Sequence, residues 1–365
     1  MILLLPSMNH YHKGGDFLVY KYEHFIPQNI APSGTKSIGV YDSSGNKIHT
    51  IALGRLTPPN KEKLYSFGLV SDIHILKAEI SPSYMHNTKF DNALSYFENQ
   101  GCSFCVVCGD LTQTGFYRRT DESDASTTYL DETQFANYKE ICDKHTMLVY
   151  ELMGNHESYY SMPITDNLPL AETYTGKSVL SYTVEQGDDL FILCGQNHGS
   201  SVMSDEDFAW LGEILEANKE RRCFVFIHPY IEEDSGDAMD VRENSIFDDI
   251  YWGATKRKAF MNLLRQYSNV ILFHGHSHMK FECQELDVNA NYTERNGFKS
   301  VHIPSSAAPR DVVFNEESQK YQSQDDRLAS QGYIVDVYDD CIVLNGRDFI
   351  GNECVPLGVY KIDTV

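Results

Sequence analysis

The sequence predicts an α/β fold in which helices pack outside β-sheets, with a small β-rich module at the N-terminus. Between residues 64 and 298, short apolar runs of strand length alternate with stretches in which apolar residues have helical spacing. Such alternation indicates layered sheets and helices. After residue 298 the strand signals follow one another closely, which predicts antiparallel strands at the end of the same sheet system.

Residues 1–60 differ in composition from the rest of the chain, because they are rich in Gly, Pro, Ser and Tyr. Within them, "DSSGNK" (42–47) lies between two apolar runs and is typical of a hairpin turn. The segment "LTPPNKEK" (56–63) follows and has the composition of a linker. We therefore predict a small β-rich module of unknown role at 1–60 and the main domain at 61–365.

Six apolar runs predict the long strands of the main domain. Their β-branched and aromatic content favours strands, and most of them end in a short polar motif. The runs are "YSFGLVSD" (65–72), "SFCVVCGD" (103–110), "MLVYELMGN" (147–155), "DLFILCGQ" (189–196), "RCFVFIHP" (222–229) and "NVILFHGH" (269–276).

Four stretches between these strands predict helices. Gly101 is placed to end the first, and Ser204 with Asp207 forms a capping pair at the start of the third. The other three repeat apolar residues along one helix face. These residues are Phe90, Ala93, Leu94 and Phe97 in the first helix, Phe135, Tyr138, Ile141 and Cys142 in the second, and Phe260, Leu263, Leu264 and Tyr267 in the fourth.

Composition limits the class of protein. The chain has 365 residues and is 42% hydrophobic, which is ample for a globular core. Its formal net charge is -22, which argues against a surface built to bind a nucleic-acid backbone. The opening "MILLLPSMNH" resembles neither a signal peptide nor a spanning helix, and nine scattered cysteines suit a reducing compartment. We predict a cytoplasmic protein without a membrane segment.

One cysteine cluster has the spacing of iron–sulfur ligands. The run "CSFCVVC" (102–108) contains C-x-x-C-x-x-C, but it coincides with a predicted buried strand. Strand alternation would place Cys105 on the face opposite Cys102 and Cys108. Three thiolates that do not converge hold no cluster, so we assign these cysteines to the core.

Five of the six long strands end in residues that bind metals. In open α/β sheets, ligands gather beyond the carboxyl ends of the strands, so these residues are expected to converge. After "NVILFHGH", Gly275 permits a sharp turn, and His276 and His278 then address one point or two nearby points. A single motif is better explained as a local cap, whereas five in a row favour a shared site. The candidate ligands are Asp72, His74, Asp110, Asn155, His228, His276 and His278.

Seven ligands overfill one tetrahedral site, so two metal ions are predicted. A bridging carboxylate would hold them about 3.5–4 Å apart, the separation used for in-line displacement at phosphorus. Mixed imidazole and carboxylate ligands suit manganese, iron or zinc better than calcium.

The motifs "DIH", "GDLTQTG", "GNHE", "IHPY" and "GHSH", in this order, resemble the calcineurin-like metallophosphoesterase signature over about residues 65–280. The resemblance implies a β-sandwich flanked by helices, with a dinuclear site at its edge. It also implies that Asp110 bridges the metals and that His156 acts on the substrate. The first metal would be held by Asp72, His74 and His278, and the second by Asn155, His228 and His276.

Two features depart from the family pattern. An acidic residue usually lies three positions after the bridging Asp and orients the catalytic histidine, but this chain has Gln113 there. A glutamine side chain accepts a hydrogen bond from imidazole but does not stabilise imidazolium as a carboxylate does; Glu157 is a candidate to compensate. The second departure is that "GDLTQTG" lacks the continuation of the protein phosphatase branch. The motif set is more similar to the bacterial cyclic-nucleotide phosphodiesterase branch, which ends in G-H-x-H.

Other residues are candidates for substrate or supporting roles. Arg118 and Arg310 lie in loops near the motifs, where a solvated ion pair is the simpler interpretation. His274 precedes the last motif and suits either the core or a place behind the metal ligands. Tyrosine-rich loops after the motifs would hold a nucleoside or aryl group, or pack on their own domain.

These patterns predict a dinuclear phosphoesterase that hydrolyses a small phosphodiester or phosphomonoester by in-line attack of a metal-bound hydroxide. Two alternatives are a binding or structural protein that works through its N-terminal module, and a nuclease of the same superfamily. The partner expected is a small phosphoester, without an extended nucleic-acid surface. The sequence leaves the natural substrate, the metal and the oligomeric state open.

Overall fold

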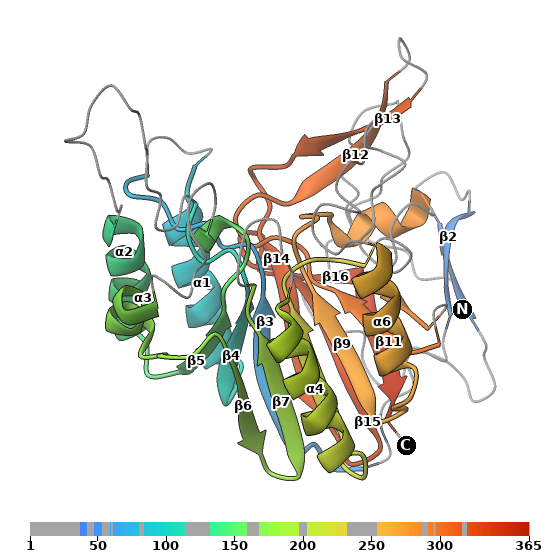
Figure 1. Cartoon of the computed structure of the whole chain (residues 1–365). Helices are drawn as coiled ribbons and strands as arrows, with labels where there is room; N and C mark the ends of the chain where they lie inside the picture. The colour runs from blue at the N-terminus through green and yellow to red at the C-terminus, as the bar shows by residue number, and fades with distance from the viewer. Residues whose placement is uncertain are drawn as a thin grey trace.

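Two six-stranded sheets form the centre of the computed structural model (Figure 1). They pack face to face, and helices cover both outer faces, as the α/β prediction requires. The structure describes residues 37–41, 47–52, 59, 61–79, 84–113, 132–158, 168–196, 203–231, 254–286, 291–294, 297–315 and 320–364.

The first sheet has the strand order β16-β15-β14-β3-β4-β5. Its parallel half consists of β3 (Tyr65–Val70), β4 (Phe104–Cys108) and β5 (Leu148–Leu152). Its antiparallel half consists of β14 (Gln331–Val337), β15 (Cys341–Asp348) and β16 (Glu353–Asp363). The predicted antiparallel end of the sheet system is confirmed for these three strands, because β14 pairs antiparallel with β3 and β15, and β15 pairs antiparallel with β16. It is wrong for residues 299–302, which pair in parallel with a strand of the second sheet.

The second sheet has the order β10-β11-β9-β8-β7-β6. Its parallel strands are β7 (Asp189–Cys194), β8 (Cys223–Ile227), β9 (Val270–His274) and β11 (Lys299–His302). The edges are antiparallel and consist of β6 (Ser181–Gln186) and β10 (Tyr292–Thr293).

Aromatic side chains fill the space between the sheets. Phe67 of the first sheet and Phe191 of the second sheet make an edge-to-face contact, with ring centroids 5.2 Å apart. Phe67 also stacks on Phe104 at 5.3 Å. This central layer holds the two sheets in a fixed relation, so that their strand ends meet at one edge.

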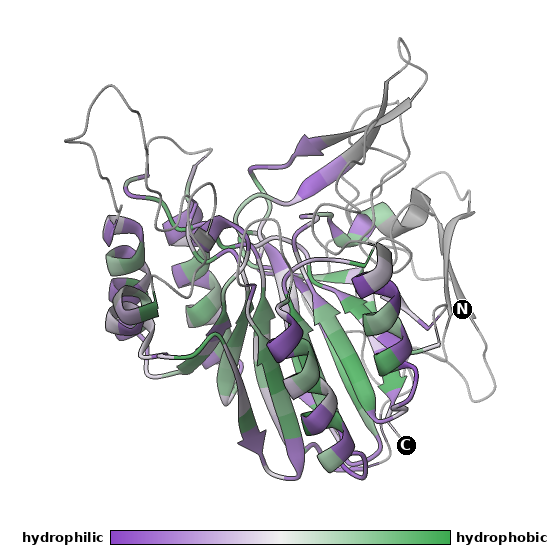
Figure 2. Cartoon of the chain, in the orientation of Figure 1, coloured by the Kyte–Doolittle hydropathy of each residue, from purple (hydrophilic) through white to green (hydrophobic). Residues whose placement is uncertain are grey.

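Helices cover the outer faces. Against the first sheet lie α1 (His86–Asn99), α2 (Glu132–Asp143) and α3 (Leu168–Thr175), and against the second lie α4 (Asp205–Ala217) and α6 (Ala254–Leu264) (Figure 1). Figure 2 shows apolar strands at the centre and mixed polarity on the helices. Most residues of the helix faces predicted from the sequence are buried, but Cys142 and Leu263 are half-buried, and Tyr267 lies beyond the end of α6.

Local signals at the helix ends also hold. Ser204 accepts a hydrogen bond from the backbone N–H of Asp207 at 3.0 Å, which is the predicted cap of α4. Gly101 follows α1 with φ of 73°, a conformation that ends a helix. Cys105 and Cys108 lie on opposite faces of β4, as predicted, but Cys102 precedes the strand and packs on the side of Cys105.

Two hairpins lie outside the large sheets. One consists of β1 (Ser37–Tyr41) and β2 (Lys47–Ala52); its turn and the rest of the module predicted at 1–60 lie outside the described residues, apart from Pro59. The other consists of β12 (Arg310–Asn315) and β13 (Lys320–Asp325), which stand away from the sandwich in Figure 1. Within the described part of the chain, no helix is long and apolar enough to cross a membrane.

Candidate metal centre

The carboxyl ends of β3, β4, β5, β8 and β9 bring together all seven residues that the sequence singled out as metal ligands. A first cluster consists of Asp72, His74, Asp110 and His278, all of them buried. Their ligand atoms lie within 4.8 Å of one another. The closest approaches are 3.0 Å, between the Nε2 atoms of His74 and His278 and between His278 Nε2 and Asp72 Oδ1.

A second cluster shares Asp110 with the first and adds His228 and His276. His228 Nε2 lies 3.2 Å from Asp110 Oδ2 and 3.2 Å from His276 Nδ1. Asn155 Oδ1 lies 3.1 Å from the same His228 nitrogen, so the amide joins this cluster. His276 and His278 therefore address two neighbouring points, one in each cluster, with Asp110 between them.

Hydrogen bonds behind the histidines fix which nitrogen faces the clusters. His228 Nδ1 lies 2.9 Å from the carbonyl oxygen of Cys108, and His278 Nδ1 lies 3.1 Å from that of Ala308. A carbonyl accepts only from a protonated nitrogen, so both rings turn an unprotonated Nε2 toward the clusters when neutral. Such support is typical of histidines that bind metals.

Each carboxylate has one oxygen committed to the protein and one facing the histidines. Asp72 Oδ2 accepts from Ser71 Oγ at 2.6 Å and from the backbone N–H of His276 at 3.0 Å. Asp72 Oδ1 is buried and accepts no hydrogen bond within the described residues. Asp110 Oδ1 accepts from the backbone N–H of His156 at 2.9 Å, while Oδ2 faces His228. A buried carboxylate oxygen left open beside imidazole nitrogens fits a metal ion.

The pKa shifts of the clustered side chains show that positive charge is stabilised between the two carboxylates. Burial alone would raise the pKa of Asp72, but the charges of His278 and His228 lower it well below its usual range. Burial alone would lower the pKa of His228, yet Asp110 and Asp72 raise it to about 10. The two carboxylates therefore favour the protonated form of His228, and a metal ion would displace that proton.

Backbone strain is concentrated at the same residues. Among described non-glycine residues, six have positive φ, and five of these are candidate ligands: Asp72 (52°), His74 (43°), Asp110 (50°), His276 (71°) and His278 (64°). Left-handed backbone costs about 1 kcal/mol or more per residue and persists only where the surroundings enforce it. The strained turns direct these side chains toward one another, whereas extended backbone would point them in different directions.

The glycines of the motifs are needed for close approach. A Cβ atom on Gly154 would lie 2.2 Å from Asp110 Oδ1, and one on Gly275 would lie 1.9 Å from Ser71 Oγ. Both distances are far below van der Waals contact, so any side chain at either position would displace the carboxylates of the clusters. This is why glycine precedes the ligand in "GNHE" and "GHSH".

His156 lies at the rim rather than inside either cluster. Its side chain is 23% exposed, and its Nε2 lies 3.8 Å from Asp110 Oδ2. Its Nδ1 donates to the backbone carbonyl of Gln113 at 2.5 Å. Gln113, the residue that departs from the family pattern, therefore orients His156 through the main-chain carbonyl of Gln113. The Gln113 side chain is not the acceptor that the sequence predicted.

Glu157 does not compensate for the missing acid, because its carboxylate is committed elsewhere. One oxygen accepts from the backbone N–H of Thr112 at 2.8 Å and the other from that of Gly154 at 2.7 Å. Burial, reinforced by Asp110, raises the pKa of Glu157 to about 7. The residue ties the loops after β4 and β5 together.

The remaining candidate residues differ in their position relative to the two clusters. His274 is buried on β9, pairs in register with His302 of β11 and faces neither cluster. Arg310 lies next to the first cluster, since its backbone N–H donates to the carbonyl of His278 at 2.7 Å. Arg118 lies outside the described residues.

Sequence reasoning missed the loop "PSSAAP" (304–309), which supports both Asp72 and His278. Ser305 Oγ donates to the backbone carbonyl of Asp72 at 2.9 Å, and Ala308 supplies the acceptor for His278. The buried ammonium of Lys89 holds this loop from α1 by donating to Ala307 O at 2.5 Å. Small residues with no charge of their own gave no signal of this role.

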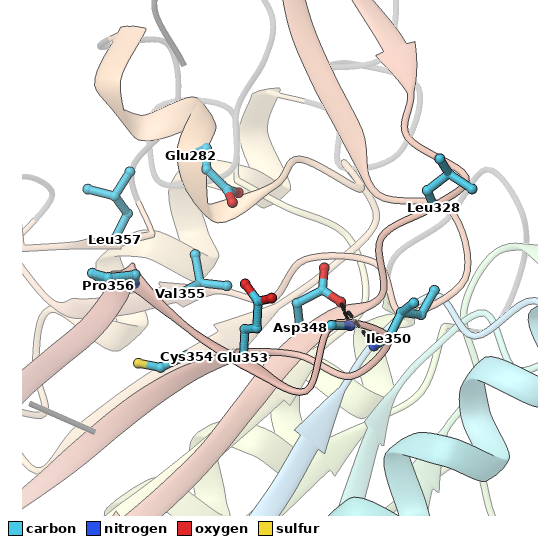
Figure 3. A pocket seen from close by; sticks show the side chains of 10 residues that line it. Glu282, Leu328, Asp348, Ile350, Glu353, Cys354, Val355, Pro356 and Leu357 are labelled. Atoms are coloured by element: carbon cyan, nitrogen blue, oxygen red, sulfur yellow. Dashed lines mark hydrogen bonds between the residues drawn. The ribbon is translucent and has the colours of Figure 1, made fainter. Parts of the chain in front are cut away.

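A separate pocket of about 180 Å³ lies between β15, β16 and the short helix η5 (Phe281–Leu286) (Figure 3). Its polar lining includes Glu282, Asp348 and Glu353, and none of the candidate metal ligands takes part. Asp348 Oδ1 accepts from the backbone N–H groups of Ile350 and Gly351, and Glu282 accepts from Gln331. The pocket is thus distinct from the metal centre.

Comparison with known proteins shows which family and which solved structures the chain resembles. A family model described as calcineurin-like phosphoesterase matches residues 65–280, more than half of the chain. No curated protein matches it. A dimetal phosphatase from Danio rerio is similar in fold, with 14% identity, a TM-score of 0.54, and coverage of 83% of this chain and 100% of that one.

A purple acid phosphatase from yellow lupin (Lupinus luteus) seeds is also similar, with 12% identity and a TM-score of 0.54. That comparison covers 90% of this chain and 59% of the lupin chain. At these identities the likeness concerns the fold. Together with the family model and the two clusters joined by Asp110, it establishes that the chain belongs to the calcineurin-like phosphoesterase family.

Proposed function

We propose that the protein is a dinuclear metal-dependent phosphoesterase acting on small phosphodiesters or phosphomonoesters. The observation that carries this proposal is Asp110, whose carboxylate belongs to both buried clusters. One carboxylate shared by two ligand sets suits two ions at the separation used for phosphoryl chemistry. The donor set of imidazole, carboxylate and amide, without thiolate, suits manganese, iron or zinc.

The residues would divide the work as follows. Asp72, His74 and His278 would hold one ion, and Asn155, His228 and His276 the other. When bound, the two ions would neutralise charge on the phosphoryl oxygens and activate water for in-line attack. His156 would contact a phosphate oxygen or, as an imidazolium, donate its Nε2 proton to the leaving oxygen and become neutral, because its Nδ1 proton is held by Gln113 O and its side chain is partly exposed beside Asp110.

The size of the substrate follows from charge. With a net charge of -22, the surface repels long polyanions, whereas a small ester needs only the local field of the metals. We favour diesters, because an alkoxide leaving group needs an acid such as His156. The two solved structures with a similar fold are phosphatases, so monoesters remain in the proposal.

A substrate panel on protein of measured metal content tests the proposal. We expect about two transition-metal ions per chain and turnover of at least one small phosphoester. Asp110→Asn should lose both metal and activity, because it removes the shared ligand. The control Asp363→Asn removes a largely exposed carboxylate that pairs only with Lys361. A stoichiometry of one ion per chain, or retention of calcium alone, would contradict the dinuclear assignment.

A further inference from the structure

Two arginines flank the first cluster and share one carboxylate. Arg310 Nε donates to Asp325 Oδ1 at 3.3 Å, and Arg327 Nη2 donates to Asp325 Oδ2 at 3.1 Å. All three side chains are partly exposed, at 27% for Arg310, 32% for Arg327 and 36% for Asp325. Asp325 thus holds two guanidinium groups side by side while leaving them open to solvent.

Arg310 bonds directly to a candidate metal ligand, and Arg327 is connected to another through two intervening side chains. The backbone N–H of Arg310 donates to His278 O at 2.7 Å.

On the other side, Arg327 lies over the ring of Tyr84, 4.0 Å from its centroid. That ring is 6.1 Å from His86, whose Nδ1 donates to the backbone carbonyl of His74 at 2.8 Å.

The donors of these arginines are far from saturated. A guanidinium offers five N–H groups, and each of these two uses a single nitrogen within the described residues. Two arginines at the opposite end of the second sheet behave differently. Arg221 and Arg222, which precede β8 at the opposite end of that strand from His228, each donate from all three nitrogens.

Within the described part of the chain, Asp325 holds each guanidinium through a single nitrogen, so the remaining N–H groups are free to bind an oxyanion. An oxyanion accepts paired N–H groups from arginine. We propose that Arg310 and Arg327, positioned by Asp325, form an anion subsite that selects phosphoesters carrying a second carboxylate or phosphate group. This inference rests on the proposed function, because the subsite acts on a substrate whose ester lies at the metals. Asp325 is a positioning residue, and the arginines contact the second anion.

A matched pair of diesters tests the subsite: 4-nitrophenyl phenyl phosphate and its analogue with a carboxylate on the phenyl ring. We expect the wild-type protein to prefer the carboxylated diester by about tenfold in kcat/KM at low salt, consistent with charge-assisted hydrogen bonds. Arg310→Gln and Arg327→Gln should each lose most of this preference, chiefly through a higher KM for the carboxylated diester than for the diester without the carboxylate. Arg310→Lys should restore part of the preference.

Arg221→Gln is the matched control, because it removes a guanidinium far from the metals. Loss of rate on both diesters in Arg310→Gln, or an unchanged preference in both arginine variants, would overturn the subsite. Metal content and thermal midpoint of each variant show whether the metal centre and the fold are intact.

Binding separates this inference from the proposed function. We expect metal-loaded protein to bind pyrophosphate about tenfold more tightly than inorganic phosphate, and Arg310→Gln and Arg327→Gln to lose that difference. If the wild-type protein hydrolysed no ester, the proposed function would fail while this measurement still decided the subsite. Equal affinity for the two anions in the wild-type protein, combined with no preference for the carboxylated diester, would reject it.

Discussion

At the scale of single residues, the two roles assigned around Asp110 differ in what their loss should remove. Asn155 lies in the second cluster, within 3.1 Å of His228 Nε2. His156, its neighbour in sequence, lies at the rim, with its Nδ1 tied to a main-chain carbonyl. Under the proposed function, these adjacent residues would therefore have different roles, Asn155 as a metal ligand and His156 as a proton donor.

We expect Asn155→Ala to lower metal occupancy and abolish hydrolysis. His156→Ala should keep its metal but lose rate by about 10²–10⁴-fold, the usual contribution of a positioned acid or base. Parallel elemental analysis and steady-state kinetics measure the difference. Equal loss of metal in the two variants would place His156 among the ligands.

Glu151 offers a residue-scale prediction away from the clusters. It is buried on β5, its Oε2 accepts from Tyr138 at 3.2 Å, and its Oε1 accepts no hydrogen bond within the described residues. Burial raises the pKa of Glu151 to about 7, against opposing effects of Lys177 and Tyr138. The folded state therefore binds the proton more tightly than the unfolded chain, and stability falls as pH rises from about 4.5 through 7.

We expect Glu151→Gln to raise the free energy of unfolding by about 2 kcal/mol relative to wild type at pH 8, and by little at pH 4, since each pKa unit corresponds to about 1.4 kcal/mol. Denaturant titrations at the two pH values measure it. Glu185→Gln, whose side chain is 73% exposed, is the control for loss of a charge. An equal gain at both pH values would mean that packing, not ionisation, sets the effect.

At the scale of elements, the centre depends on how loops leave the strands. The parallel halves of both sheets end at the same edge, and strained turns follow β3, β4 and β9. Gly275 lets the turn after β9 pass against Ser71, the residue that follows β3. The two sheets therefore meet most closely where the carboxylates must face the histidines.

Gly275→Ala should disrupt this meeting point, because its Cβ would lie 1.9 Å from Ser71 Oγ and 2.7 Å from Asp72 Oδ2. We expect loss of metal binding and destabilisation by about 1–3 kcal/mol, typical of an overpacked site. Gly212→Ala in α4 is a matched control, since its Cβ would meet only Leu263 at 3.8 Å and the helix should gain about 0.5–1 kcal/mol. Full metal content in Gly275→Ala would show that the loop shifts without cost.

At the scale of the whole molecule, the sequence predicted the layers and which polar side chains lie together, because both depend on local signals. Buried runs such as "FCVVC" predict strands, and a ligand at the end of each predicts where they converge. The supports were beyond such reasoning. The main-chain carbonyls of Gln113 and Ala308 hold His156 and His278, and residues of any type carry a main-chain carbonyl. The approach of Arg327 to the first cluster also required the tertiary fold.

Net charge gives the last prediction, and it concerns the molecule as a whole. With 52 acidic and 30 basic residues, the chain as a whole repels a polyanion, while a small diester would experience mainly the local positive field of the proposed metals. We therefore expect manganese-loaded protein to hydrolyse bis(4-nitrophenyl) phosphate and to degrade duplex DNA poorly. Raising the ionic strength from about 0.02 M to about 0.2 M shortens the screening length from about 20 Å to under 10 Å, so cleavage of DNA should rise relative to that of the small diester. Kinetics on both substrates across this range measure the ratio. Duplex cleavage that exceeds small-diester turnover at the lowest salt would instead support a nuclease, because an acidic surface could not then be setting substrate size.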